Sequence, residues 1–289
     1  MKRLIKTMVL VAAGLMVVAC NGNKFDSKKN ICVISREDGS GTKSAFMEII
    51  GLKGKSDVKD VVIASGTAAV LEEVKINPYA IAYDSLGYIT EDVKKLSVDG
   101  VEPTTTKIKS GDYKISRPLN VVYKESNVKS SDLLTSYLGF LGTKEAEKII
   151  SEKGYVVPVE ATNNYQINTA LYGTIKISGS TSLQPLMIVL AAKYEALQTS
   201  VKIEVSGGGS GTGYANAEND VSNFGMISEE FKLEKAPDCV FSTVAKDGIA
   251  IIVNKINTYT NISKDQLKNI YNVEQDSATK ISLWKDLDN

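Results

Sequence analysis

Three short segments of this chain consist largely of glycine, serine and threonine. They are SREDGSGT from Ser35 to Thr42, SGSTSL from Ser178 to Leu183 and SGGGSGTG from Ser206 to Gly213. Such residues can turn several backbone N–H groups and hydroxyls toward one point, and this arrangement binds anions. The first segment adds Arg36, whose guanidinium is permanently charged. These residue types predict the capture of a small tetrahedral oxyanion.

The parts that most enzymes need are missing from the sequence. It contains no histidine, which excludes Ser-His-Asp and Cys-His catalysis and histidine metal sites. Neither Ser40 nor Ser210 lies in a G-x-S-x-G nucleophile elbow, and no glycine-rich segment ends in the G-K-[ST] of a phosphate-binding loop. The 34 basic and 34 acidic residues balance, so nothing indicates a nucleic-acid partner. We expect a binding protein, with no metal and no cofactor.

The N-terminus has the pattern of an export signal. Lys2, Arg3 and Lys6 precede the apolar run from Met8 to Val18, which is shorter than the roughly 20 residues of a spanning helix. Cys20 then follows small residues as in a bacterial lipobox, although Val17 stands where leucine is usual. We expect residues 1–20 to be a lipoprotein signal peptide, with an ordinary cleaved signal or a short anchor as alternatives.

Lipid attachment at Cys20, including a palmitate-type acyl chain, would hold the protein on the extracytoplasmic face of the cell membrane. Residues 21–30 are polar and lack periodicity, and this predicts a flexible tether. Cys32 and Cys239 lie in apolar, strand-like runs. Two buried thiols are favoured there, while a disulfide stays possible outside the cell.

Apolar strand-like runs alternate with helical patterns along the chain, as in an α/β protein with mostly parallel sheets. The roughly 260 residues after the signal suffice for two compact domains. Strands are expected at 31–35, 61–64, 80–83, 117–124, 174–178, 201–206 and 248–254. Helices are expected at 42–50, 67–75, 131–142, 144–153, 183–197, 214–218 and 263–272.

Two of the three glycine-rich segments stand between a predicted strand and the start of a predicted helix. The third segment repeats this order through the short helix that begins at Tyr214. A helix N-terminus offers unpaired N–H groups and about half a positive charge, so anions bind there without net protein charge. One such segment is usually a turn, but three at equivalent positions favour a shared anion site.

The same segments carry a family resemblance. SREDGSGT, ISGSTSLQPL, VSGGGSGTG and the strand DGIAIIVN closely resemble the phosphate-binding proteins of the high-affinity phosphate ABC importer, within the periplasmic solute-binding protein superfamily. The match continues through PYAIAYDSLGYI, RPLNVVYK and INTYTNISKDQLKNIYN, and so covers nearly the whole mature chain.

The resemblance implies a two-lobed periplasmic-binding-protein-like (type II) fold with a hinge. It implies a monomer that binds inorganic phosphate between the lobes and delivers it to the transmembrane subunits of an ABC permease. The alternative is a sensory or adhesion protein of the same fold that binds an oxyanion.

The order of the segments departs from the family. REDGSGT opens the mature chain and WKDLDN closes it, whereas SGSTS comes first in the usual arrangement. Joining Asn289 to Lys29 would restore the usual order, with residues 171–174 linking the former ends. This pattern is typical of a circular permutation. On this order, one lobe would comprise residues 31–90 and 254–289, and the other residues 91–253.

The resemblance also assigns the phosphate ligands. One lobe would supply Arg36, Asp38, Ser40, Gly41 and Thr42, and the other Thr181, Ser182, Ser210 and Ser228. Arg36 would bind two anion oxygens, with Asp38 orienting it.

One departure from the family pattern bears on proton recognition. Some relatives carry an aspartate where this chain has Ser228. Recognition of the proton on phosphate would then fall to Asp38, to a serine lone pair or to Glu229.

Overall fold

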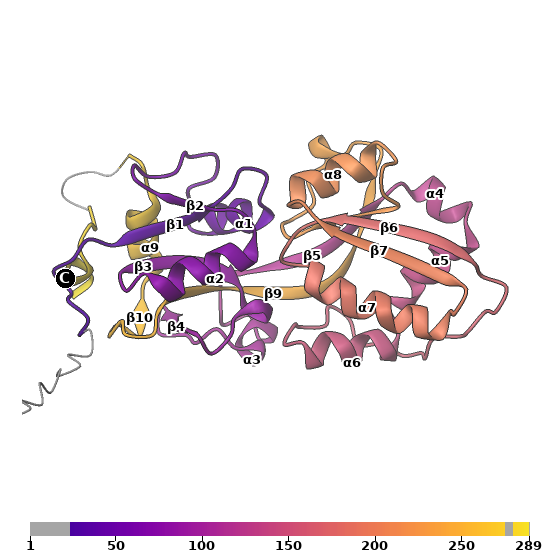
Figure 1. Ribbon diagram of the computed structural model, residues 1–289, viewed down its shortest axis with the longest axis horizontal. Coiled ribbons are helices and arrows are strands. Elements are labelled where there is room, and N and C mark those ends of the chain that lie inside the picture. The colour runs from indigo at the N-terminus through magenta and orange to yellow at the C-terminus, as the bar shows by residue number, and fades with distance from the viewer. Residues whose placement is uncertain (1–23, 275–279, 289) are drawn as a thin grey trace, which may run out of the picture.

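The computed structural model describes residues 24–274 and 280–288. Two halves lie side by side along its longest axis, and two strands, β5 (Ser116–Tyr123) and β9 (Val240–Asn254), run between them (Figure 1). The first half contains β1 (Cys32–Arg36), α1 (Gly41–Ile49), β2 (Val62–Ala64), α2 (Thr67–Ile76), β3 (Ala80–Ser85), β4 (Val93–Val98), α3 (Thr105–Lys109), β10 (Asn261–Ile262) and α9 (Lys264–Tyr271).

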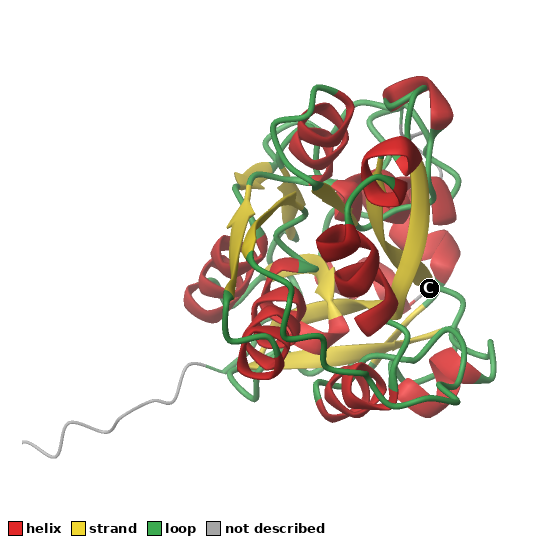
Figure 2. Ribbon diagram, turned by 90° about the vertical axis from the view of Figure 1, so that its right-hand side faces the viewer, coloured by secondary structure: helices red, strands yellow, loops and turns green. Residues whose placement is uncertain are grey.

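The second half is built from the middle of the chain. It contains α4 (Glu125–Lys129), α5 (Asp132–Phe140), α6 (Lys144–Glu152), β6 (Gly173–Gly179), α7 (Gln184–Leu197), β7 (Val201–Gly207), α8 (Ser210–Glu218) and β8 (Phe224–Ile227). Short 3₁₀ turns occur at Leu86–Tyr88, Leu233–Lys235 and Trp284–Asp288. Helices lie on both sides of the strands (Figure 2).

The strands follow the order β2-β1-β3-β9-β5-β8-β6-β7, and β4 joins this path by pairing with β9 and β10. Pairing is parallel within each half, from β1 to β2 and β3 and from β6 to β7 and β8. It is antiparallel where β9 meets β3, β4 and β5. The predicted α/β fold, in the manner of a two-lobed binding protein, is confirmed.

Each half has its own apolar core. In the first half, successive residues of β9 point to opposite faces of the sheet, so Ile251 packs with Phe46 on one face and Ala250 packs with Val70 on the other. The second half packs around a separate cluster that includes Tyr137 and Phe224. Strands β5 and β9 therefore pass from the apolar core of one half to the apolar core of the other.

The division of the chain differs from the boundary expected near residue 90. Leu96 and Ile115 lie in the same apolar cluster as Phe46, and Tyr113 donates a hydrogen bond to the backbone oxygen of Ile249 at 2.8 Å. Leu96 joins the first half because β4 pairs with β9 and β10, and Ile115 joins it because its oxygen accepts the Ile249 N–H at 2.8 Å. Such long-range pairing leaves no local signal in the sequence.

The two ends of the described chain lie against each other. Ile31 donates its N–H to the Ser282 oxygen at 2.8 Å, and Trp284 donates to the Lys29 oxygen at 3.2 Å. Phe25 packs on the Trp284 ring, with centroids 5.6 Å apart. Residues 24–30 are therefore packed, which differs from the flexible tether expected over 21–30, because the aromatic side chain of Phe25 finds an apolar surface.

The expected signal peptide, with the lipid-attachment site Cys20, lies outside the described residues. Among residues 24–274 and 280–288, no helix has the length and apolar character needed to cross a bilayer.

Candidate functional site

Arg36 stands at the carboxyl end of β1 with 1% of its surface exposed. Its Nε and Nη2 donate to the two carboxylate oxygens of Glu37, each at 2.8 Å. Nη2 also donates to Thr181 Oγ1 of the second half at 3.1 Å. The remaining nitrogen, Nη1, is buried without a hydrogen-bond partner. A buried cationic donor without a partner is costly, so this nitrogen indicates a position for an anion.

Glu37, not Asp38, orients the guanidinium. The expected role of Asp38 is wrong in this structure, since the Asp38 side chain is fully exposed and its Oδ1 accepts from Lys43 Nζ at 3.0 Å. The carboxylate of Glu37 instead turns back onto Arg36 and also accepts the Gly66 N–H at 3.1 Å. Burial raises the pKa of Glu37, but the hydrogen bonds and charge of Arg36, together with backbone hydrogen bonds, hold the pKa below its usual value.

Hydroxyls from the two halves meet beside Arg36. Thr42 Oγ1 lies 2.9 Å from Ser182 Oγ. Thr67 Oγ1 lies 3.3 Å from both Ser182 Oγ and Thr181 Oγ1. Thr42 and Thr67 belong to α1 and α2, whereas the other two residues lie in the turn before α7. These bonds therefore join the first half to the second half.

Further contacts, some within the second half and some between the halves, lie at the start of α8. Gly211 donates its N–H to the Gly39 oxygen at 3.0 Å. Ser210 Oγ lies 3.3 Å from Ser228 Oγ and accepts the Ser228 N–H at 3.0 Å. A Cβ on Gly41 would clash with both serine hydroxyls, so only glycine allows the halves to approach this closely here.

Four helices begin at this place. Helix α1 is capped by Ser40, whose hydroxyl accepts the Lys43 N–H at 3.3 Å. Helices α2 and α8 each start after a glycine, Gly66 and Gly209, with a φ of 86°. The turn before α7 supplies the fourth start. Helix N-termini attract anions, and this arrangement brings several of them around one guanidinium.

The structure brings together all but one of the predicted site residues. Arg36, Ser40, Gly41, Thr42, Thr181, Ser182, Ser210 and Ser228 gather where the halves meet, and Asp38 faces solvent. The sequence reasoning missed Glu37 and Thr67. A signal for Thr67 was present, because Ser65-Gly66-Thr67 repeats the order of strand, glycine and helix start.

Glu229 is engaged away from this group of hydroxyls. Its carboxylate accepts from Lys232 and Lys235, each at 2.7 Å, and from Ser44 of α1 at 2.5 Å. Burial raises the pKa of Glu229, but these hydrogen bonds outweigh it and lower the pKa below its usual value. Glu229 therefore connects the two halves as a carboxylate and does not serve as the proton acceptor considered from the sequence.

No group of three or more acidic or cysteine side chains among the described residues could hold a metal ion. Cys32 and Cys239 are both free thiols, as favoured from the sequence, although Cys32 is only half-buried. Burial raises the pKa of Cys239 to about 12, so this thiol stays protonated.

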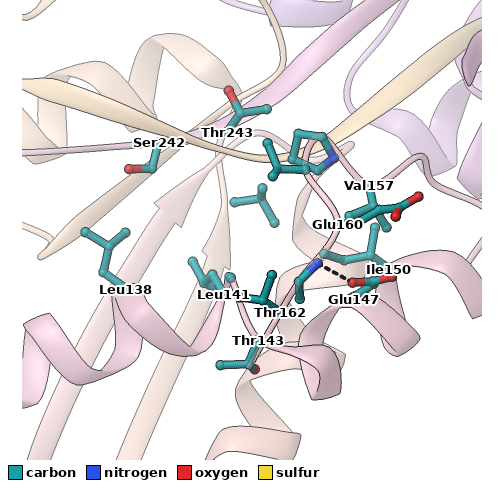
Figure 3. A pocket seen from close by; sticks show the side chains of 15 residues that line it. Leu138, Leu141, Thr143, Glu147, Ile150, Val157, Glu160, Thr162, Ser242 and Thr243 are labelled. Atoms are coloured by element: carbon teal, nitrogen blue, oxygen red, sulfur yellow. Dashed lines mark hydrogen bonds between the residues drawn. The ribbon is translucent and has the colours of Figure 1, made fainter. Parts of the chain in front are cut away.

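A cavity of about 650 Å³ lies elsewhere, in the second half (Figure 3). Its walls include Leu138, Ile150 and Val157, and Glu147 on its rim accepts the Ala161 N–H at 2.6 Å. None of the predicted anion ligands lines this cavity.

Comparison with known proteins finds a matching superfamily model and several similar proteins. A model of the PBP superfamily domain matches residues 23–145 and 164–289. The phosphate-binding protein PstS 2 of Streptococcus agalactiae serotype V is 32% identical over 287 residues, which cover 96% of this chain and 94% of that protein. The phosphate-binding protein PstS of Bacillus subtilis is 35% identical over 118 residues, or 40% of this chain and 37% of that protein.

Among solved structures, a phosphate-binding protein of a phosphate ABC transporter from Streptococcus pneumoniae is similar to this chain. It is 31% identical, with a TM-score of 0.70 over 89% of this chain and 99% of that structure.

Proposed function

This chain belongs to the PBP superfamily, among the phosphate-binding proteins of ABC transporters, and from this premise we propose that it captures inorganic phosphate in the cleft between its halves and delivers it to a membrane permease. The chain is a binding protein rather than an enzyme. The observation that carries the proposal is the unpartnered Nη1 of buried Arg36, among helix starts from both halves.

The cleft suits a tetrahedral oxyanion with several acceptor oxygens. Hydroxyls and helix-start N–H groups supply donors from both halves, and Arg36 supplies the charge. Hydrogen bonds to a charged partner are about twice as strong as neutral ones, so Arg36 dominates the affinity. An anion that bonds to both halves favours the closed arrangement, since it gains contacts there that it loses on opening.

The hinge would lie where β5 and β9 pass between the halves. The apolar clusters support lobes of residues 24–115 with 249–288, and of residues 116–247. At the crossing, Arg117 Nη2 donates to Asp247 Oδ2 at 3.1 Å, and both side chains are about 1% exposed. A rigid buried pair on two adjacent strands suits a pivot.

The segment order supports a circular permutation relative to other phosphate-binding proteins. The described ends are hydrogen-bonded to each other, as a former internal loop would be. The Bacillus subtilis protein aligns over only 40% of this chain, which is the result expected when the order differs. The Streptococcus agalactiae protein aligns over 96%, so the same order is expected there.

The membrane attachment rests on the sequence. Cys20 would carry the lipid and hold the protein, as a monomer, on the extracytoplasmic face of the cell membrane. Because residues 24–30 pack on the first half, only the few residues before them would separate the fold from the lipid.

Calorimetric titration of the purified full-length chain with phosphate tests the function. The unaltered protein should bind phosphate tightly, and Arg36→Ala should weaken binding at least about 100-fold, because two or more charged hydrogen bonds are lost. Thr162→Val, on the separate cavity, should bind phosphate like the unaltered protein. Absence of phosphate binding to the unaltered chain would overturn the proposal.

A further inference from the structure

One face of α1 continues the contact between the halves beyond the anion site. Gly41, Ser44 and Glu48 follow one another at spacings of three and four residues, so they lie on the same side of this helix. Gly41, at the helix start, faces Ser228 of the second half. Ser44 and Glu48 extend this side of the helix away from its start, and therefore away from the turn that faces the anion.

The Ser44 hydroxyl lies between two oppositely charged groups of the second half. It donates to Glu229 Oε2 at 2.5 Å and accepts from Lys232 Nζ at 2.7 Å. Lys232 Nζ also donates to Glu229 Oε2 at 2.7 Å, so the three side chains form a closed ring of hydrogen bonds, the Ser44 ring. Glu229 and Lys232 belong to the segment after β8, whereas Ser44 belongs to α1. The ring is therefore complete only when the two halves are in contact.

The charged members of the Ser44 ring remain paired when the halves separate. Glu229 and Lys232 are 3% and 17% exposed and belong to the same half. Lys235 of that half donates to the other carboxylate oxygen, Glu229 Oε1, at 2.7 Å. Separation therefore leaves no uncompensated charge, and its cost in the ring is the loss of the two bonds that Ser44 makes. Both involve a charged partner, and such bonds contribute more than bonds between neutral groups.

The ion pair further along α1 contributes less. Lys232 Nζ lies 3.9 Å from a carboxylate oxygen of Glu48, which is 43% exposed. Glu48 is already paired with Lys53 of its own half at 2.8 Å. Exposed ion pairs are screened by solvent, so the contact on this side of α1 depends mainly on the Ser44 hydroxyl.

The Ser44 ring is separate from the hydroxyls beside Arg36. There Thr42 Oγ1 bonds to Ser182 Oγ. The partners of the Ser44 hydroxyl are instead a carboxylate and an ammonium group, whose charges compensate each other. The carboxylate repels an oxyanion and holds the lysine that could attract one. The ring therefore acts on the closure of the halves and not on the anion.

We propose that Ser44 sets the affinity for the anion without touching it, by holding the halves closed through Glu229 and Lys232. The inference rests on the proposed function. Contacts that exist only in the closed arrangement favour it over the open one, and the apparent affinity of a ligand rises with the population of the state that binds it. Ser44 is thus a positioning residue. Because the ring forms after the anion has entered, its loss should speed release and leave the rate of capture unchanged.

The first test substitutes Ser44→Ala in the full-length chain. Calorimetry should show phosphate binding about tenfold weaker, and a chase of bound radioactive phosphate with unlabelled phosphate should show release about tenfold faster. Alanine favours the helix, and the open protein lacks the ring, so the unfolding temperature without phosphate should not fall. The matched control is Ser151→Ala, an exposed serine of α6, which should leave affinity and release unchanged.

The second test approaches the ring from the other half. Lys232→Met removes the donor to Ser44 and Glu229, while Lys235 keeps Glu229 paired. This variant should also bind phosphate more weakly. Since Ser44 and Lys232 act in one ring, the variant with both substitutions should lose less affinity than the product of the two single losses. Losses that multiply would show two independent effects and would overturn the ring.

Unchanged phosphate affinity in Ser44→Ala would overturn the inference while phosphate capture stands. A lower unfolding temperature of Ser44→Ala without phosphate would also overturn it, because Ser44 would then support the fold and not the closure. Failure of the unaltered chain to bind phosphate would instead remove the proposed function itself.

Discussion

At the scale of single residues, the neighbours Glu37 and Asp38 differ in their partners and in their exposure to solvent. Glu37 forms a bidentate ion pair with the guanidinium of Arg36, whose side chain is 1% exposed. The Asp38 side chain is exposed to solvent and forms an ion pair with Lys43. A buried charge that loses its partner is costly, while an exposed ion pair contributes little. Their positions in the sequence give no hint of this difference.

Glu37→Ala should lower the free energy of unfolding by about 3 kcal/mol, since Arg36 is left buried without its carboxylate. Asp38→Ala should leave the free energy of unfolding nearly unchanged, because an exposed ion pair is screened by solvent. Urea denaturation of both variants, without phosphate, measures the difference. Equal destabilisation by the two substitutions would contradict the assignment of Glu37 as the partner of Arg36.

The buried carboxyl of Asp84 gives stability a pH dependence. Its pKa is about 7 in the fold, above the value of about 4 in an unfolded chain, so the folded state binds more protons between these values. The stabilisation that Asp84 contributes is therefore fully present below about pH 4. As the pH rises toward about 7, this contribution to the free energy of unfolding falls by up to about 1.4 kcal/mol per pH unit.

Asp84→Asn should remove this fall. Thermal or urea unfolding of both proteins across the same pH range, without phosphate, gives the difference in the free energy of unfolding. The variant should gain stability relative to the unaltered protein as pH rises. A difference that stays constant with pH would show that Asp84 titrates normally.

At the scale of elements, the site depends on helices that start where the two halves meet. Gly41 in the first turn of α1 faces the hydroxyls of Ser210 and Ser228 from the other half. Because this contact crosses between the halves, a side chain at Gly41 would oppose closure more than it would disturb either core.

Gly41→Ala should leave the fold intact and weaken phosphate binding by about 100-fold, since the added methyl group must displace two hydroxyls before the cleft can close. Calorimetry and small-angle scattering with phosphate measure affinity and closure. Gly139→Ala in α5, where a Cβ meets nothing within 4 Å, is the matched control. Unchanged affinity in Gly41→Ala would argue against the closed contact.

The sequence predicted the strands and helices that carry a strong apolar pattern. The strand expected at 248–254 is the apolar part of β9, which actually begins at Val240. Its earlier residues include Ser242, Thr243 and Lys246, whose polarity hid the strand, and their pairing with β5 is a tertiary effect. Strand β4 was missed because it forms by pairing with β9 and β10.

For the site, the glycine-rich segments contain Arg36, Thr181 and Ser210, and the family resemblance assigned these residues as ligands. Such turns have a local signature, since Gly66 and Gly209 adopt a positive φ before a helix. The burial of Asp84 has no local signature, because it comes from the strands that pair with β3 on either side. Contacts between strands decide such roles, and they are invisible in a single sequence.

At the scale of the whole molecule, the order of the segments matters less than their closed arrangement. Residues 29–31 and 282–284 are hydrogen-bonded to each other, and Tyr172 is 80% exposed at the proposed former ends. Contacts in a compact fold depend on the elements, so moving the ends to an exposed loop should preserve them.

A rearranged chain with Asn289 joined to Lys29 and new ends at Tyr172 should fold and bind phosphate within about tenfold of the original affinity. Circular dichroism and calorimetry check both properties. As a control, new ends within α7 should abolish folding, because this helix packs on the second core. A rearranged chain that fails to fold would contradict the permutation.

Trp284 is the only tryptophan of the sequence, and it is fully buried against Phe25 and Tyr259 where the chain ends meet. This place is at the outer tip of the first half, away from the region between the halves (Figure 1). Its intrinsic fluorescence should therefore report detachment of the termini and stay silent when an anion binds. Anion binding between the halves would instead need a fluorescent label placed where the two halves meet.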